Sequence, residues 1–185
     1  MKLKKSFVIV LCGILLLFGG CSAVTKISYP TDFKAIVLKY CKKNNLDAYT
    51  VFAMIKKESK FVCDAQSDKG AKGLMQLTDD TAKWTAEKEG IENFKEEMLF
   101  DPETNIRLGC AYFAYLLEMY NNDKNLALCA YNAGPGRVSE WLSDKSISEN
   151  SKTLNNIPYS ETENYLEDIL GYEQKYKQLY PDLQS

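Results

Sequence analysis

Glu58 occupies a position where the apolar face of an expected helix would otherwise continue. Val51, Met54 and Ile55 precede it at the spacing of one helix face, whereas Lys57 points elsewhere. Burial beside this face and the negative end of the helix dipole both disfavour a charged carboxylate, so the sequence predicts a raised pKa for Glu58. A carboxyl group that keeps its proton near neutral pH suits general acid catalysis. The alternative is an exposed glutamate at a helix end with no chemical role.

The composition narrows the chemistry that such a carboxyl could take part in. The chain of 185 residues contains no histidine, which excludes a Ser-His-Asp triad, a Cys-His pair and a histidine-ligated zinc site. Proton transfer would therefore fall to carboxylates, tyrosines or lysines. The only arginines are Arg107 and Arg137, and no basic stripe is present, so nucleic acid is not an expected partner. No CxxC pair suggests a metal or a redox centre.

The elements that position Glu58 are nearly all helical from residue 31 onward. A mostly α fold is expected, with at most a small extended segment near residues 63–77, where Asp, Ser and Gly interrupt the pattern. A second irregular stretch covers residues 143–158. The first helix is expected from Thr31, a capping residue, to near Asn44-Asn45, and further helices are expected at 48–61, 79–90, 101–122, 123–133 and 160–180. Pro102 suits the first turn of the fourth helix, while Gly134-Pro135-Gly136 stops the fifth.

The N-terminal residues 1–23 have the three-part form of an export signal. Three lysines precede an apolar run from Phe7 to Phe18, which is too short to span a bilayer comfortably. The ending "FGGC" favours a lipoprotein signal in which Cys21 is lipidated, although Phe18 departs from the usual leucine. Ordinary cleavage before Val24 and a retained anchor are the alternatives. Each places the domain outside the cytoplasmic membrane, after a short tether at residues 24–30.

Four cysteines belong to the domain itself: Cys41, Cys63, Cys110 and Cys129. Export permits disulfides, and four cysteines allow three pairings. The apolar helical surroundings of Cys110 and Cys129 equally suit small buried thiols. The sequence leaves both possibilities open.

Four blocks carry a resemblance to a known family. The segments "ESKF", "SDKGAKGLMQ", "AYNAG" and "SETENY", with "DPETNIRLG", resemble the catalytic domain of the soluble lytic transglycosylases in order and spacing over residues 31–181. The resemblance implies a lysozyme-like helical domain with a saccharide cleft. It implies non-hydrolytic cleavage of the β-1,4 bond between N-acetylmuramic acid and N-acetylglucosamine in peptidoglycan, giving 1,6-anhydromuramic ends. Glu58 would be the single general acid and base, with no cofactor.

The same resemblance assigns substrate-binding positions by motif. They are Ser59, Ser67, Gly73, Met75, Gln76, Tyr131, Asn132, Glu161 and Tyr165. Structural alternatives accompany several of them. Serines are common as caps and in turns, Met75 could be core packing, and "YNAG" could simply end a helix with glycine. Tyr165 follows Glu161 by four residues, so both lie on one helix face and could tie the last helix to the core.

Two rival functions stand beside this prediction. A hydrolase of the goose-type lysozyme kind would need a second carboxylate to activate water, for which Asp64 and Asp68 are candidates. Asp79 and Asp80 are better interpreted as caps of the helix that starts there. A wall-binding module without turnover is the second rival. Peptidoglycan strands are the expected partner, with the membrane reached by the anchor; protein partners, endo or exo cleavage and physiological role are not indicated.

Overall fold

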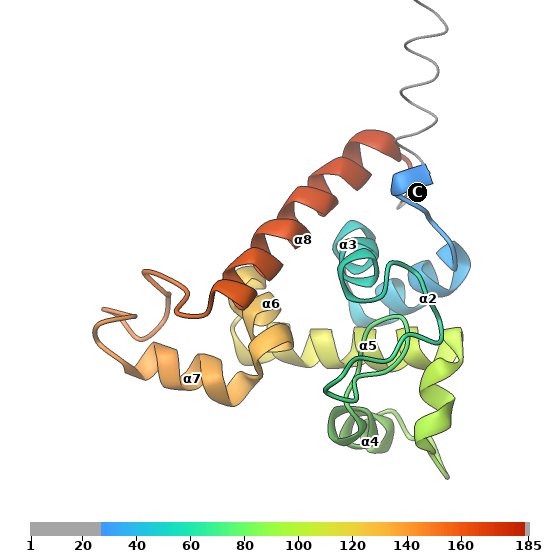
Figure 1. The fold of residues 1–185 in the computed structure, drawn as a ribbon, viewed down its shortest axis with the longest axis horizontal. Coiled ribbons are helices and arrows are strands. Elements are labelled where there is room, and N and C mark those ends of the chain that lie inside the picture. Colours follow the sequence, from blue (N-terminus) through green and yellow to red (C-terminus); the bar gives the residue numbers. More distant parts are fainter. Residues whose placement is uncertain (1–26, 184–185) are drawn as a thin grey trace, which may run out of the picture. The chain divides into compact units, whose positions relative to one another are not determined.

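The computed structural model describes residues 27–183, and the predicted export signal and Cys21 lie outside the described residues. The helices are α2 (Lys34–Asn44), α3 (Ala48–Glu58), α4 (Asp79–Lys88), α5 (Pro102–Met119), α6 (Lys124–Ala133), α7 (Pro135–Ser143) and α8 (Ser160–Leu179), with the 3-10 turn η1 (Glu96–Phe100) (Figure 1). Within the described part of the chain, none of them is both long and apolar enough to cross a membrane.

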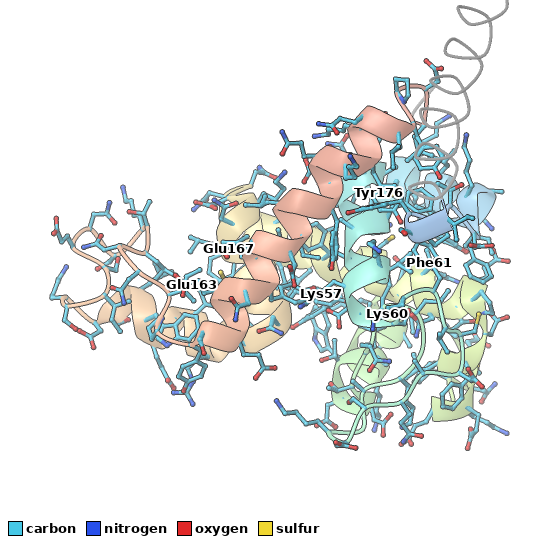
Figure 2. All side chains as sticks on the ribbon, turned by 45° about the horizontal axis from the view of Figure 1, so that its top comes forward. Lys57, Lys60, Phe61, Glu163, Glu167 and Tyr176 are labelled. Atoms are coloured by element: carbon cyan, nitrogen blue, oxygen red, sulfur yellow. The ribbon has the colours of Figure 1, made fainter. Side chains whose placement is uncertain are left out.

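Helix α3 is buried along most of its length, and α2 and α8 pack on it. Every residue of α3 from Ala48 to Ile55 is buried. This helix lies against α2 and along α8, while α5 packs on α2, α4 and α6 (Figure 1). Figure 2 shows Lys57 and Tyr176 along the contact of α3 with α8. Lys57 Nζ is 2.6 Å from Asp168 Oδ2, and the Tyr176 ring packs on Phe52 at 5.6 Å between centroids. The buried residues Ala48–Ile55 therefore fix the position of Glu58 at the end of the same helix.

The expected extended segment is present as two isolated antiparallel bridges. Gln66 pairs with Lys72, and Lys72 pairs with Leu77, in the loop between α3 and α4. The Ser67 N–H donates to the Ala71 carbonyl at 2.9 Å, which closes the turn at the tip. No longer strand occurs among the described residues, so the loop is a folded turn rather than a sheet.

Helix boundaries follow the local capping chemistry, with three corrections to the sequence analysis. Asp101 caps α5 through the Thr104 N–H, with Pro102 in the first turn as predicted. The start expected at Thr31 is wrong: α2 begins at Lys34 after Phe33 in a left-handed conformation. The residue that caps α4 is Thr78, and the two aspartates interpreted as caps lie in its first turn. The helix α7 was not expected, because Gly134-Pro135-Gly136 was interpreted only as the end of a helix. In the structure Gly134 is both the C-cap of α6 and the N-cap of α7.

The four domain cysteines are free thiols in the structure. Cys41, Cys110 and Cys129 are buried, and Cys63 is half-buried. Cys110 of α5 lies beside Cys41 of α2, and a hydrogen bond between them, together with burial, raises the pKa of Cys110. The sequence had left thiols and disulfides equally open, and the structure has thiols.

Candidate active site

Glu58 is the last residue of α3, at the end of the buried apolar run. Its side chain is half-buried, and Ser59 follows as the C-cap. Burial raises the pKa of Glu58 to about 7, although the Tyr165 hydroxyl and the charge of Lys57 act in the opposite direction. Near neutral pH the acid and the carboxylate are therefore both populated. A group with such a pKa can give a proton and take one back within a single reaction.

Tyr165 is the direct partner of this carboxyl group. It lies on α8, is 2% exposed, and its hydroxyl donates to Glu58 Oε1 at 2.7 Å. Burial and the neighbouring Glu58 hold the pKa of Tyr165 well above its ordinary value, so it stays a donor. The resemblance placed Tyr165 at the site, but its bond to Glu58 was not predicted.

Tyr131 and Asn132 connect the end of α6 to two other elements. The Tyr131 hydroxyl donates to the Met75 carbonyl at 2.8 Å, which ties α6 to the loop before α4. Asn132 Oδ1 accepts a hydrogen bond from the buried Thr162 hydroxyl of α8 at 2.8 Å. Burial, followed by the charge of Glu58, raises the pKa of Tyr131 well above its ordinary value. The "YNAG" motif thus joins the loop and α8 beside the carboxyl group.

Asn105 of α5 holds the loop in place, and the sequence analysis missed it. Its side-chain amide donates to the Lys72 and Leu99 carbonyls, both at 2.9 Å, and accepts from the Met75 N–H at 2.7 Å. Gly73 has a φ of +75°, and a Cβ there would overlap the Leu99 carbonyl and the Asn105 amide. The close approach at Gly73 is therefore to the protein itself. An asparagine inside the apolar pattern of a helix was the available signal.

Met75 and Gln76 lie in the loop before α4, whose Met75 carbonyl accepts the hydrogen bond from Tyr131 of α6. Met75 is fully buried, and its side chain fills the space above Gly109 of α5. Gln76 has a φ of +48°, and its Nε2 donates to the Gly73 carbonyl at 2.9 Å and the Ala65 carbonyl at 3.1 Å. Both amide protons of Gln76 are used within the loop, so only its amide oxygen remains for a ligand.

Three further predicted residues form contacts with groups other than Glu58 and Tyr165. The Ser59 hydroxyl donates to the Ile55 carbonyl at 3.3 Å. The exposed Ser67 hydroxyl accepts from the Ala71 N–H at 3.1 Å. Glu161 is exposed, with its carboxylate 3.7 Å from Lys69 Nζ. The ligand-binding roles of these three residues stay predictions.

The comparison with known families decides what this arrangement belongs to. Residues 35–154, more than half of the chain, match the sequence model described as "Transglycosylase SLT domain". The chain belongs to the transglycosylase SLT domain family. The matched range contains Glu58, the loop, Asn105 and the "YNAG" motif, but ends before α8.

Relatives of known name match much of this SLT domain. A "soluble lytic murein transglycosylase" of Salmonella typhimurium is 31% identical over 151 residues, or 80% of this chain. The structure of an inactive mutant of lytic transglycosylase Slt from Pseudomonas aeruginosa, a glutamate-to-glutamine replacement, is 37% identical, covers 83% of this chain and gives a TM-score of 0.73. The structure of the 70-kDa soluble lytic transglycosylase of Escherichia coli is 29% identical in sequence, covers 87% of this chain and gives a TM-score of 0.74.

These matches confirm the fold class but cover only part of the relatives. The mostly helical, lysozyme-like fold expected from the sequence is the fold of these SLT domains. The chain spans about a quarter of the length of the proteins it matches, 23%, 25% and 27% respectively.

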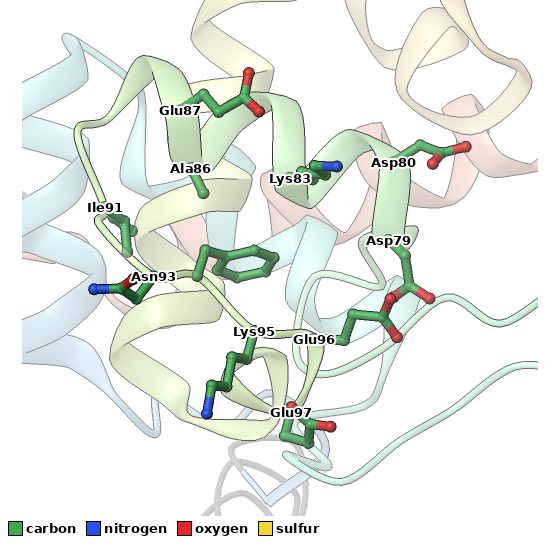
Figure 3. Close-up of a pocket in the computed structure, with 11 residues that line it drawn as sticks. Asp79, Asp80, Lys83, Ala86, Glu87, Ile91, Asn93, Lys95, Glu96 and Glu97 are labelled. Carbon is green, nitrogen blue, oxygen red and sulfur yellow. The ribbon is translucent and has the colours of Figure 1, made fainter.

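The most voluminous of the described cavities in this SLT domain lies away from Glu58. A cavity of about 830 Å³ opens between α4 and η1, with a mainly acidic lining (Figure 3). Its charged rim includes Asp79, Asp80, Glu87, Glu96 and Glu97, and Glu58 is not among the lining residues. Among residues 27–183, no group of three or more His, Cys, Asp or Glu side chains is arranged to hold a metal ion.

Proposed function

We propose that this chain is a peptidoglycan lytic transglycosylase. It would cleave the β-1,4 bond between N-acetylmuramic acid and N-acetylglucosamine without water, leaving a 1,6-anhydromuramic end. The observation that carries the proposal is Glu58, whose pKa is raised to about 7 and whose Oε1 is held by Tyr165. The names of the relatives support the activity, and the inactive glutamate-to-glutamine mutant among them supports a glutamate as the essential group.

One carboxyl group suffices for both proton transfers of this reaction. Neutral Glu58 gives its proton to the leaving O4 of N-acetylglucosamine as the bond from that oxygen to muramic C1 breaks. The carboxylate then takes the proton of the C6 hydroxyl as O6 bonds to C1, which restores the acid. The substrate's own acetamido group shields the cation between the steps. Because the nucleophile belongs to the same sugar, its effective concentration is high and no activated water is required.

The surrounding contacts suggest how the site is divided. With Oε1 held by Tyr165, Oε2 of Glu58 would face the glycosidic oxygen. Asn132 uses its oxygen for Thr162, so its amide nitrogen is left to donate to a sugar carbonyl or hydroxyl. Gln76 would accept through its amide oxygen. The Tyr131 ring would provide a face for a sugar, while its hydroxyl holds the loop at Met75.

The remaining roles follow from the motif positions. Ser59, Ser67 and Glu161 would contact substituents of the glycan, with Gly73 and Met75 shaping the loop beneath it. The place of action would be the outer face of the cytoplasmic membrane or the cell wall, with the chain anchored through Cys21. Both proposals are supported by the sequence of residues 1–23 and by the nature of the substrate.

The test is mass spectrometry of the products released from purified peptidoglycan. The wild-type chain is expected to give anhydromuramic ends, and Glu58→Gln is expected to release none while keeping its fold. Glu167→Gln is the matched control, because Glu167 is an exposed carboxylate on α8 (Figure 2) and should leave the products unchanged.

Each other outcome corresponds to one rival function. Reducing muramic ends would mean that water is the nucleophile, and Asp64 and Asp68 would then be tested as the second carboxylate. Wild-type chain that binds peptidoglycan but releases nothing would identify a wall-binding module. Full activity of Glu58→Gln would overturn the assignment of the acid.

A further inference from the structure

The chain turns sharply where α3 ends, in a conformation that its residue types disfavour. Lys60 and Phe61 follow the end of α3 (Figure 2), and both have a positive φ, 52° and 67°. The Val62 N–H donates to the Ser59 carbonyl at 3.1 Å, which closes a β-turn whose two central residues are left-handed. Such turns favour Asn and Gly, because a Cβ in this conformation crowds the following carbonyl oxygen. We call residues 59–62 the strained turn.

The end of α5 has a similar turn without this strain. Asn121 and Asn122 have φ values of 53° and 63°, and the Asp123 N–H donates to the Tyr120 carbonyl at 2.9 Å. Both turns begin at the C-cap residue of a helix. Asparagine tolerates the left-handed conformation, so residue type and backbone agree after α5. The disagreement after α3 requires a compensating interaction.

The ring of Phe61 provides this compensation. It is half-buried and stacks on Phe52 of α3, with centroids 6.2 Å apart and an angle of 27° between the rings. Phe52 is fully buried and packs on Tyr176 of α8. Lys60, in contrast, is exposed, and lysine readily continues a helix. Phe61 is therefore the residue whose side chain fastens the strained turn to the core.

The strained turn lies between two parts of the candidate active site. Helix α3 ends at Glu58, because the residues after Ser59 leave the helical conformation. Shortly after the turn, the Ala65 carbonyl accepts from the Gly73 N–H at 2.8 Å and from Gln76 Nε2 at 3.1 Å. A relaxed turn would lengthen α3 beyond Glu58 and displace the backbone that orients Gln76.

We propose that Phe61 is a positioning residue for Glu58. Its ring, stacked on Phe52, keeps the strained turn closed, so that α3 ends at the carboxyl group and the loop with Gln76 keeps its place. The proposal deepens the proposed function and rests on it for the role of Glu58. Phe61 acts through the backbone and needs no contact with the glycan.

A comparison of alanine with glycine at position 61 tests the proposal. Phe61→Ala removes the ring but keeps a Cβ, so the strained turn loses its anchor and relaxes. Phe61→Gly also removes the ring, but glycine adopts a positive φ without steric cost. We expect Phe61→Ala to lower kcat for the release of anhydromuramic products about tenfold or more, since a displacement of about 1 Å can cost about a hundredfold. Phe61→Gly should recover most of this loss.

A matched control and a rescue variant exclude a general effect of the substitutions. Val62 is the control, because it follows Phe61 directly, is exposed and does not have a positive φ. There the usual order should hold, with Val62→Ala at least as active and as stable as Val62→Gly. The double variant Lys60→Asn, Phe61→Asn copies the turn at Asn121 and Asn122, and it should recover most of kcat without a ring. If Phe61 only packed the core, this variant would be as impaired as Phe61→Ala.

The pKa of Glu58 gives a second readout that does not require turnover. Measured by NMR titration of the carboxyl carbon, the pKa should fall toward 4.5 in Phe61→Ala, because a relaxed turn exposes Glu58 and moves the negative end of the helix dipole away from it. In Phe61→Gly the pKa should stay at about 7. The substitutions leave in place the titratable neighbours of Glu58 on α8, α6 and α3, which are Tyr165, Tyr131 and Lys57.

The outcomes separate this proposal from the proposed function. If folded Phe61→Ala matched Phe61→Gly in kcat, or kept the wild-type pKa of Glu58, the positioning role would be overturned, whatever products the wild type releases. Phe61→Leu, which keeps part of the apolar contact, replaces Phe61→Ala if that variant does not fold; a wild-type kcat and pKa in Phe61→Leu would then overturn the role. A pKa of Glu58 that depends on Phe61 as expected, in a wild type that makes no anhydromuramic ends, would support the role of the turn and reject the transglycosylase.

Discussion

The hydrogen bond between Glu58 and Tyr165 lowers the pKa of Glu58 and raises the pKa of Tyr165. Burial raises the pKa of the carboxyl group, while the tyrosine hydroxyl, by donating to Oε1, favours the charged form and lowers it. Removing the donor in Tyr165→Phe should therefore move the pKa of Glu58 further above 7. The ring remains to fill the buried position. Such a bond to a charged group corresponds to a shift of about one pH unit.

The pH profile of kcat/KM checks this expectation. Glu58 must be protonated to act as the acid, so the rate of the wild type should fall as pH rises through about 7. In Tyr165→Phe the alkaline limb should lie at higher pH, with a lower maximum because the carboxyl group is less well oriented. Tyr176→Phe is the control on the same helix, since Tyr176 packs on Phe52. A limb that stays in place or moves to lower pH would contradict the assignment of Tyr165.

At the scale of residues, what could be predicted depends on how local the signal is. The position of Glu58 on an apolar face can be recognised from the spacing of residues within one helix. The raised pKa of Glu58 was predicted from that position. Its bond to Tyr165 joins residues 107 positions apart, and no local pattern encodes such a pair. Asn105 was missed for a similar reason, because its three partners lie on the loop and on η1 rather than on its own helix.

Among the elements, α5 supports the loop at Met75 through a glycine as well as through Asn105. A Cβ on Gly109 would overlap the Met75 side chain, including its Cβ at 2.9 Å. Gly109→Ala should therefore destabilise the protein by about 1–3 kcal/mol, the usual cost of overpacking. It should also lower activity, because Met75 carries the carbonyl that holds Tyr131.

Urea unfolding with a matched glycine tests this element. Gly171 lies in α8, and a Cβ there meets nothing within 4 Å. Gly171→Ala should be neutral or stabilise the helix by up to about 1 kcal/mol, because alanine loses less conformational entropy than glycine. Equal effects of the two substitutions on the free energy of unfolding would show that the Met75 contact is not tight.

Periodicity predicted the helices α2, α3, α4, α5, α6 and α8, whereas α7 and some helix boundaries required tertiary information. Pro102 marked the start of α5 correctly, since proline favours the first turn regardless of the fold. The Gly134-Pro135 pair was interpreted only as a stop, yet the same proline opens α7. The start of α2 moved from Thr31 to Lys34, because Phe33 takes a left-handed conformation that its residue type does not favour.

Over the whole molecule, two carboxyl groups give stability opposite dependences on pH. Glu173 is 5% exposed, bonds to Thr50 and two lysines across α3, α6 and α8, and has a lowered pKa. Burial acts against this shift, and the hydrogen bonds from Lys124 and Lys177 outweigh it. Its contribution is complete above its unfolded-state pKa and is lost as pH falls through the lower folded-state value.

Glu58 shows the reverse dependence, which yields a prediction for the free energy of unfolding. Its folded-state pKa of about 7 lies above the unfolded value of 4.5, so the folded chain binds more protons between these pH values. Stability therefore decreases as pH rises from about 4.5 to 7, and Glu58→Gln should remove this loss. The variant should match the wild type near pH 4 and exceed it by up to about 3 kcal/mol above pH 7, measured by urea unfolding across pH. Glu167→Gln, which removes an exposed carboxylate, is the control variant. A difference in the free energy of unfolding between Glu58→Gln and the wild type that stays constant with pH would contradict a raised pKa of Glu58 in the folded chain.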